Sequence, residues 1–317
     1  MPTFDKLVVV TRKTRLQELI ERFNTRGQAK FYLEHSGGDF AEYESEHDTY
    51  QRAADVVRRA LDVGLPRQDL DRSLVSTYRF AAGDVVVVLG QDGLVANVAK
   101  YAGAQPIIGV NPDPARYDGI LLPWQPPETR RAVTAVLAGA AVARAVTLAE
   151  VTLNDGQRLL AFNDLFIGAR THVSARYRIR AGGAVEAQSS SGVLVSTGAG
   201  STGWISSVFN MAAGVTAFVG GEGRHGVQLD WEDPRLLFAV REPFISRHST
   251  AAIVAGYVPP GDELVLESLL PTGGVIFSDG IESDFLHFSA GVTARVRASP
   301  QHAMLVVQAP AGQHAGS

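Results

Sequence analysis

The 317-residue chain contains no cysteine, which excludes disulfide bonds, thiolate metal sites and cysteine nucleophiles. Long apolar runs are also missing, because the longest one, AVLAGAAVARAV, is interrupted by Arg144 and is too short to span a bilayer. The amino-terminal sequence MPTFDKLVVVTRKT lacks the basic-then-apolar pattern of a signal peptide. These absences predict a cytoplasmic protein that does not enter a membrane.

An excess of positive charge is missing as well. The chain has 29 Lys and Arg against 33 Asp and Glu, so its formal net charge is −4. A basic surface for nucleic acid or for anionic lipid is therefore not expected. The hydrophobic share of 45% and the charged share of 20% are typical of a globular chain. We expect small-molecule partners and no nucleic acid.

Buried strands and amphipathic helices alternate through the first 139 residues. Strand-like apolar runs occur at 7–10, 85–89, 106–110 and 119–123, and KFYLEH (30–35) is a further strand candidate. Helical spacing of apolar residues occurs at 14–27, 47–64 and 126–139. This alternation is typical of a parallel sheet covered on both faces, in which ligands bind at the carboxyl ends of the strands.

Short alternating runs with turn signals replace this pattern beyond residue 139. NDG (154–156) and AGG (181–183) each separate two strand-like runs, which predicts two hairpins. Helical spacing is weak here, apart from a turn or two after Thr202. The sequence therefore predicts an α/β domain at 1–139, a mostly antiparallel, sandwich-like β domain at 140–309 and a disordered tail at 310–317.

A glycine-containing loop follows the apolar run VVVVL (85–89). It reads Gly90, Gln91, Asp92, Gly93 and precedes a segment with helical spacing. Strand, glycine loop and helix is a layout that favours phosphate, although a carboxylate repels phosphate unless it binds Mg²⁺ or accepts a proton from an attacking hydroxyl. The alternative is an ordinary turn in which Asp92 caps the helix, and the four residues alone favour that alternative.

Two further stretches carry polar groups where a ligand could bind. Asn163 and Asp164 interrupt an apolar strand, and buried polar groups are costly unless they are paired. They could hold ribose hydroxyls or an adenine edge; alternatively, one faces solvent and the other bonds neighbouring backbone. A loop of small residues at 197–203 ends at Trp204, a flat stacking surface, and could equally be a solvent loop.

Together these stretches resemble the NAD kinases, which share a superfamily with diacylglycerol and sphingosine kinases. The family's GGDG loop corresponds to Gly90–Gly93, its GVN to Gly109–Asn111, its ALNE to 161–164 and its STPTGSTAY to 196–204. The order and rough spacing of the motifs agree across residues 5–308. The SSG run and the tryptophan that closes the last motif look more like the mitochondrial-type branch.

The resemblance implies a kinase that phosphorylates the adenosine-ribose 2′-hydroxyl of NAD to give NADP. ATP or polyphosphate would be the donor, Mg²⁺ would be required, and the chain would form a homodimer or homotetramer. Asp92 would accept the hydroxyl proton, beside a phosphate loop of Gly90, Gln91 and Gly93. Substrate-binding positions would be Asn111, Asn163, Asp164, Ala199, Gly200, Ser201, Thr202, Trp204 and Ser207.

Some residues depart from the family pattern. Gln91 replaces the second glycine of the loop, and Ser191 stands where the common branch has an Asp. Two alternatives therefore stay open: a kinase of the same fold that acts on a sugar or lipid hydroxyl, and a non-catalytic NAD(P)-binding protein. For three other stretches we favour a structural role without function. SDGIESDF (278–285) is expected to be a hairpin turn, residues 35–47 a solvated acidic loop, and Arg241 and Arg247 surface arginines.

Overall fold

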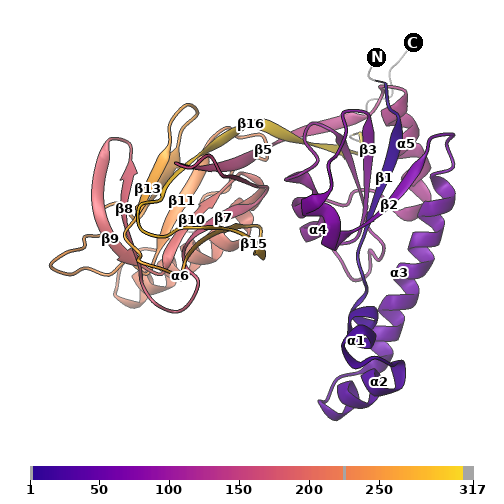
Figure 1. Ribbon diagram of the computed structural model, residues 1–317, viewed down its shortest axis with the longest axis horizontal. Helices are drawn as coiled ribbons and strands as arrows, with labels where there is room; N and C mark the ends of the chain where they lie inside the picture. Colours follow the sequence, from indigo (N-terminus) through magenta and orange to yellow (C-terminus); the bar gives the residue numbers. More distant parts are fainter. Residues whose placement is uncertain (1–2, 224–225, 310–317) are drawn as a thin grey trace. The chain divides into compact units, whose positions relative to one another are not determined.

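The computed structural model describes residues 3–223 and 226–309, so the expected tail at 310–317 lies outside the described residues. The chain divides into two compact units, Met1–Arg144 with Met304–Ser317, and Ala145–Ala303. Residues 304–309 thus lie with the first unit, whereas the sequence places them in the β domain. The reason is strand β16 (Thr293–Val307), whose Met304 and Leu305 pair with a strand of the first unit (Figure 1).

The first unit is built on a parallel sheet in the order β2-β1-β3-β4. Its strands are β1 (Lys6–Thr11), β2 (Arg67–Asp71), β3 (Asp84–Leu89) and β4 (Pro106–Val110). Its helices are α1 (Arg15–Phe23), α2 (Arg26–His35), α3 (Phe40–Ala60), α4 (Asp92–Ala99) and α5 (Thr129–Leu137), with 3₁₀ turns at Arg72–Thr77 and Pro126–Glu128. Apolar residues of α3 and α5 pack on one face of the sheet, and α4 contacts β3 and β4. The predicted parallel α/β architecture is therefore confirmed.

Three details of the first unit were predicted wrongly. KFYLEH forms part of helix α2, which Thr25 caps and which packs through Ala29 against Leu16 and Phe40. Residues 119–123 form no strand: Ile120 and Leu121 lie in a turn, and Trp124 makes an isolated bridge to Val110. The stretch 35–47 is not an acidic loop, because α3 begins at Phe40 and continues through it. Each error concerns a short segment whose tertiary contacts override its local pattern.

The second unit is a sandwich of two antiparallel sheets. One layer is formed by β5 (Val142–Leu153), β6 (Arg158–Ala161), β8 (Ala175–Ala181), β9 (Ala184–Ser190), β13 (Leu264–Ser268) and β16, which belong to the same ten-stranded sheet as β1–β4. The other holds β7 (Asp164–Ala169), β10 (Gly192–Ser196), β11 (Leu236–Arg241), β12 (Ala255–Val258), β14 (Gly274–Ser278) and β15 (Ile281–His287). One core cluster joins inward side chains of both sheets, such as Tyr177 and Ile179 from the first and Ile167 and Phe238 from the second. This arrangement confirms the predicted antiparallel sandwich.

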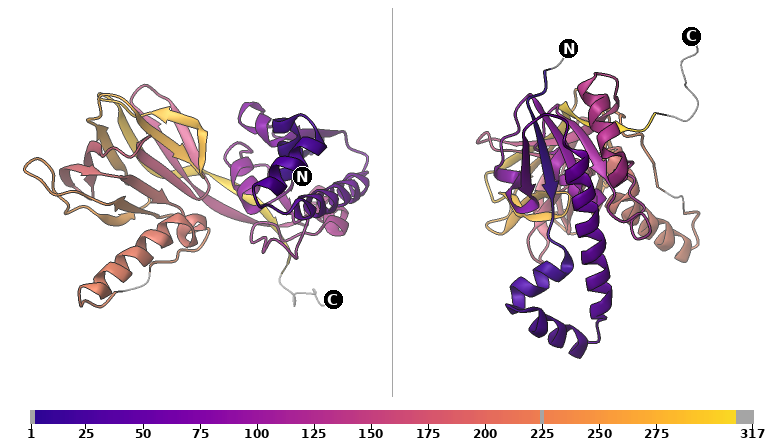
Figure 2. Two further views of the ribbon diagram at one scale, coloured as in Figure 1. Left: turned by 90° about the horizontal axis from the view of Figure 1, so that it is seen from below. Right: turned by 90° about the vertical axis from the view of Figure 1, so that its right-hand side faces the viewer.

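Both predicted hairpins occur, β5–β6 through NDG and β8–β9 through AGG. The expectation of little helix beyond residue 140 is wrong, however, because α6 spans Trp204–Phe218 after a 3₁₀ turn at Ala199–Thr202. Ile205 buries the start of α6 against Leu229 and Leu237. The other end extends away from the strands (salmon, left view of Figure 2), and Phe218 is 89% exposed. Within the described residues, no helix has the length and apolar character that crossing a bilayer demands.

Candidate active-site residues

The GQDG loop lies at the carboxyl edge of the parallel sheet. Strand β3 is buried along its whole length, and the Gly90 N–H donates to the Val110 carbonyl at 3.3 Å. Gln91 has φ −112° and ψ 164°, an extended backbone that any residue adopts. The replacement of a glycine by Gln91 therefore causes no backbone strain in this loop.

Asp92 is the first residue of helix α4, and Gln91 rather than Asp92 is its N-cap. The Asp92 carboxylate accepts a hydrogen bond from the Leu121 N–H at 2.6 Å, so a segment beyond β4 fixes its position. The alternative in which Asp92 merely caps the helix is thus not what the structure shows. Asp92 is half-buried at the amino end of α4, where the helix dipole favours an anion.

The two glycines of the loop differ in what surrounds them. A Cβ added to Gly90 would lie 2.8 Å from Leu94 Cδ2, whereas no described atom lies within 4 Å of a Cβ added to Gly93. The space beside Gly93 is therefore open, and its backbone is exposed. A ligand could approach the amino end of α4 closely at this position.

Asn111 follows β4 and lies next to the loop, because Leu89 pairs with Val110 in the neighbouring strands. Its Nδ2 donates to the Tyr117 carbonyl at 2.9 Å, and its Oδ1 accepts from the Asp113 N–H at 3.0 Å. Both polar atoms of this buried side chain thus shape the turn beyond β4.

A group of charged residues that the sequence did not indicate lies at the same edge. Arg12 directly follows β1, and the buried Glu46 accepts from Arg12 at 2.9 Å and from Arg15 at 2.5 Å. Burial alone would raise the pKa of Glu46, but the hydrogen bonds from Arg15 and Arg12 outweigh burial and lower it. Glu46 therefore stays ionised, and the three side chains together carry one net positive charge. The only signal in the sequence is an arginine placed immediately after a buried strand.

The second unit brings the Asn163–Asp164 pair and the 196–204 loop together. Ser196 pairs with Asp164 in the ladder between β10 and β7, and the Thr197 N–H donates to the Asn163 carbonyl at 2.9 Å. A Cβ on Gly200 would lie 2.1 Å from that same carbonyl oxygen. This close approach of two backbones requires glycine at position 200.

The remaining predicted residues of the second unit differ in how far they are exposed. The Ser201 hydroxyl is buried, donates to the Gly198 carbonyl at 2.7 Å and accepts from the Leu229 N–H at 3.1 Å, so it holds the loop together. Thr202 and Ser207 are exposed, whereas Ala199, Asn163 and Trp204 are half-buried and Asp164 is buried. The exposed hydroxyls are the ones open to a ligand.

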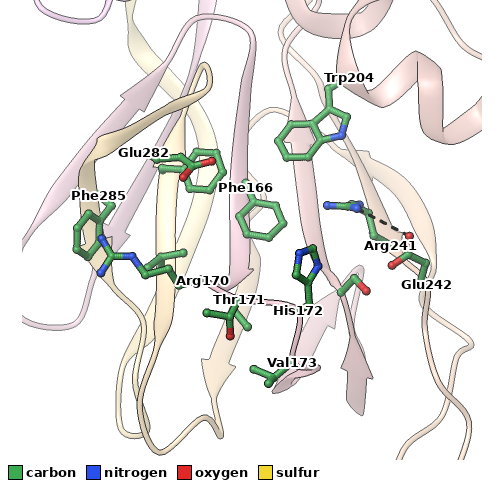
Figure 3. Close-up of a pocket in the computed structure, with 14 residues that line it drawn as sticks. Phe166, Arg170, Thr171, His172, Val173, Trp204, Arg241, Glu242, Glu282 and Phe285 are labelled. Atoms are coloured by element: carbon green, nitrogen blue, oxygen red, sulfur yellow. Dashed lines mark ion pairs between the residues drawn. The ribbon is translucent and has the colours of Figure 1, made fainter. Parts of the chain in front are cut away.

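Trp204 also lines a cavity of about 650 Å³ that lies wholly within the second unit (Figure 3). Its ring stacks on Phe166 with a centroid separation of 5.7 Å and an interplanar angle of 14°. The Arg241 guanidinium lies 5.4 Å from the Trp204 ring centre and pairs with Glu242 at 3.8 Å. The other lining residues are Ala169, Arg170, Thr171, His172, Val173, Ser191, Val275, Phe277, Glu282 and Phe285.

This cavity joins flat aromatic surfaces to two guanidinium groups, since Arg170 also lies 4.6 Å from the Phe285 ring centre. Aromatic faces stack on planar rings, and arginine forks bind phosphate oxygens. Most of these residues lack a recognisable sequence pattern, because strands β7, β11, β14 and β15, helix α6 and loop residues beside them supply the lining from distant parts of the sequence. The cavity fits an aromatic ring that carries phosphate.

A metal cage built from side chains is not seen. Among residues 3–223 and 226–309, no three His, Asp or Glu side chains group closely enough to hold a metal ion. Mg²⁺ often takes only one or two carboxylates from a protein and completes its shell with phosphate oxygens and water. Asp92 is a carboxylate that fits such a role at the edge of the parallel sheet.

The chain thus consists of a parallel α/β unit and an antiparallel sandwich, and strand β16 runs from the sandwich to pair with β4. No family model and no curated protein matches the chain in sequence. Among solved structures, the yeast NADH kinase complexed with NADH has a TM-score of 0.59 at 16% identity, over 97% of this chain and 84% of that chain. An NAD kinase from Archaeoglobus fulgidus in complex with ATP has a TM-score of 0.56 at 15% identity, over 95% and 93%. The chain thus has the two-domain fold of the NAD kinases.

Proposed function

We propose that this chain is an NAD kinase, which transfers a phosphoryl group to the adenosine-ribose 2′-hydroxyl of NAD and gives NADP. The observation that carries the proposal is the placement of Asp92, held by the Leu121 N–H at the open amino end of α4. The likeness of the fold to NAD(H) kinases supports the same reaction. The closer likeness to the mitochondrial-type branch stays a prediction.

Asp92 acts as the proton acceptor. The 2′-oxygen attacks the terminal phosphorus of the donor, the new O–P bond forms as the bond to the leaving nucleoside diphosphate breaks, and the hydroxyl proton passes to Asp92. General-base assistance of this kind is worth about 10²–10⁴-fold in rate. The open backbone at Gly93 and the dipole of α4 favour the negative charge of the phosphate.

The second unit binds the dinucleotide. Asn163 and Asp164 hold the adenosine side, Thr202 and Ser207 offer exposed hydroxyls, and the aromatic cavity at Trp204 takes a ring with its phosphates near Arg241. Asn111 shapes the turn beyond β4 in the first unit, and Gly200 and Ser201 shape the 196–204 loop. Contacts of these three residues and of Ala199 with the substrate stay predictions.

The donor is ATP, which the Archaeoglobus enzyme binds, with polyphosphate as the alternative. Mg²⁺ supplies charge neutralisation when bound, mainly through donor phosphates and with Asp92 as the protein carboxylate that fits. A homodimer or homotetramer stays a prediction of the family resemblance, and a cytoplasmic location stays a prediction from the composition.

The test is the variant Asp92→Asn, which keeps the shape of the side chain and removes the proton acceptor. NADP formation should fall by about 10²–10⁴-fold, while the KM for NAD and the thermal midpoint change little. Asp118→Asn is a matched control, because Asp118 is an exposed carboxylate in the segment beyond β4, and it should keep full activity. The assay should offer NAD⁺ and NADH as acceptors, and ATP and polyphosphate as donors. Wild-type turnover by Asp92→Asn would rule out the proposed mechanism.

A further inference from the structure

Asp279 lies in the turn between β14 and β15, yet its carboxylate reaches a distant part of the second unit. Its Oδ2 accepts from the Phe162 N–H at 3.0 Å, and its Oδ1 accepts from the N–H groups of Asn163 and Asp164 at 2.6 and 3.3 Å. The Asp279 N–H in turn donates to the Asp164 carbonyl at 3.0 Å. One side chain therefore binds three successive amides that lie 115–117 residues earlier in the chain.

The segment that Asp279 binds needs such a partner. Residues 162–163 lie in the break between β6 and β7, where no sheet ladder satisfies their amides in the described structure. On the carbonyl side, the Thr197 hydroxyl donates to Phe162 at 2.5 Å and the Thr197 N–H donates to Asn163. The backbone that carries Asn163 and Asp164 is thus held by its N–H groups on one side and by its carbonyls on the other.

A purely local role for Asp279 does not explain these contacts. Asp155 lies in another tight hairpin turn, between β5 and β6, and its carboxylate accepts a hydrogen bond from the Gln157 backbone N–H two residues away. Asp279 has φ +52°, in the left-handed region that a non-glycine residue rarely adopts, and its bonds leave its own turn. The Asp279 carboxylate therefore serves the contact with residues 162–164, and a role confined to its own turn does not account for it.

We infer that Asp279 is a positioning residue: its carboxylate fixes the backbone of residues 162–164 and so sets where the Asn163 and Asp164 side chains stand for the dinucleotide. This inference rests on the proposed function, because the use of those two side chains comes from it. Asp279 itself need not touch substrate. Charge-assisted bonds to backbone amides are among the stronger hydrogen bonds in proteins, so the segment is fixed before any ligand arrives.

The test compares Asp279→Asn with Asp155→Asn, an identical change in another hairpin turn. An asparagine keeps one acceptor oxygen. In place of the second oxygen it has an NH₂ group, which is a donor and cannot accept the hydrogen bond from a backbone N–H. In Asp279→Asn, amide hydrogen exchange at residues 162–164 should accelerate at least about tenfold, while exchange in β11 stays unchanged. The KM for NAD should rise about tenfold, with the KM for ATP and the thermal midpoint close to wild type. Asp155→Asn should change none of these quantities.

Two outcomes would overturn the inference. Exchange at residues 162–164 that is as slow as in the wild type would show that Asp279 does not hold the segment. Faster exchange with an unchanged KM for NAD, or an equal rise in the KM for ATP, would show that holding the segment does not serve the dinucleotide. If the wild type neither binds nor phosphorylates NAD, the proposed function fails and the positioning of a dinucleotide site is rejected with it. The exchange data then still report whether the carboxylate holds the segment, so the two failures differ.

Discussion

The variant Gly93→Ala tests whether a phosphate approaches the GQDG loop, because it should affect protein stability and enzyme activity in opposite directions. Gly93 is the second residue of α4 and Gly27 is the second residue of α2, and a Cβ added to either meets no described atom within 4 Å. Both glycines are exposed and neither has a positive φ. Alanine at such a position stabilises a fold by about 0.4–1 kcal/mol, chiefly because it restricts the unfolded chain. We expect Gly93→Ala and Gly27→Ala to raise the free energy of unfolding by similar amounts.

The two variants should differ in activity. If a donor phosphate approaches the backbone at Gly93, a methyl group there displaces it and weakens a hydrogen bond to a charged group, which costs about 1.5–3 kcal/mol, or roughly 10–100-fold in kcat/KM for ATP. Gly27→Ala should keep wild-type kinetics. Denaturant unfolding and initial-rate measurement of NADP formation provide both numbers from one preparation. A stable Gly93→Ala enzyme with wild-type kcat and KM would refute the reasoning, because nothing would then approach the loop at this position.

Two further predictions follow from close packing and from buried charge. Gly200→Ala should destabilise the fold by about 1–3 kcal/mol and raise the KM for NAD, because its Cβ would lie 2.1 Å from the Asn163 carbonyl oxygen; Gly214→Ala in α6, with open space around it, should do neither in thermal unfolding and kinetic assays. Glu46→Gln should cost about 3 kcal/mol at neutral pH, because it removes the ion pair of the Arg12 guanidinium, whose side chain is largely buried. Since the folded-state pKa of Glu46 lies below its usual 4.5, its stabilisation is present above about pH 4.5 and is lost as the pH falls further. Measured from pH 7 to pH 3, the free energies of unfolding of the wild type and of Glu46→Gln should therefore approach each other. A difference between them that does not change with pH would contradict this assignment.

The sequence predicts those parts of the fold whose signal is local and periodic. The run VVVVL reads as a buried strand because all its side chains are buried, and NDG reads as a turn because Gly156 adopts a positive φ of 87°. Helix α6 escapes prediction because its apolar side chains spread around the helix instead of forming one stripe, so that Val215 and Phe218 stay exposed. KFYLEH escapes because Phe31 and Tyr32 favour strands while the helix around them is fixed by contacts elsewhere.

In the candidate site, too, the residues with a local sequence signal could be predicted and the contacts between distant segments could not. The positions of Asp92, Asn163 and Trp204 follow from short motifs and from their resemblance to a family, and their roles stay predictions. The partner of the Asn163 backbone could not be found in this way, because the contact with Asp279 joins segments more than a hundred residues apart. In the sequence, Asp279 is only the Asp of a turn, and only the folded chain shows what its carboxylate binds.

Strand β16 has a consequence for the order in which the chain is made. The parallel sheet of the first unit gains Met304 and Leu305 beside β4, and the Trp124 indole donates to the Val306 carbonyl at 2.9 Å. A ribosome therefore has to translate nearly the whole message before this sheet can be completed, and until then Pro106 and Ile107 of β4 lack their strand partner. Completion of the amino-terminal sheet must therefore wait for the last segment of the chain, and we expect a nascent chain stalled before residue 304 to expose this part of β4.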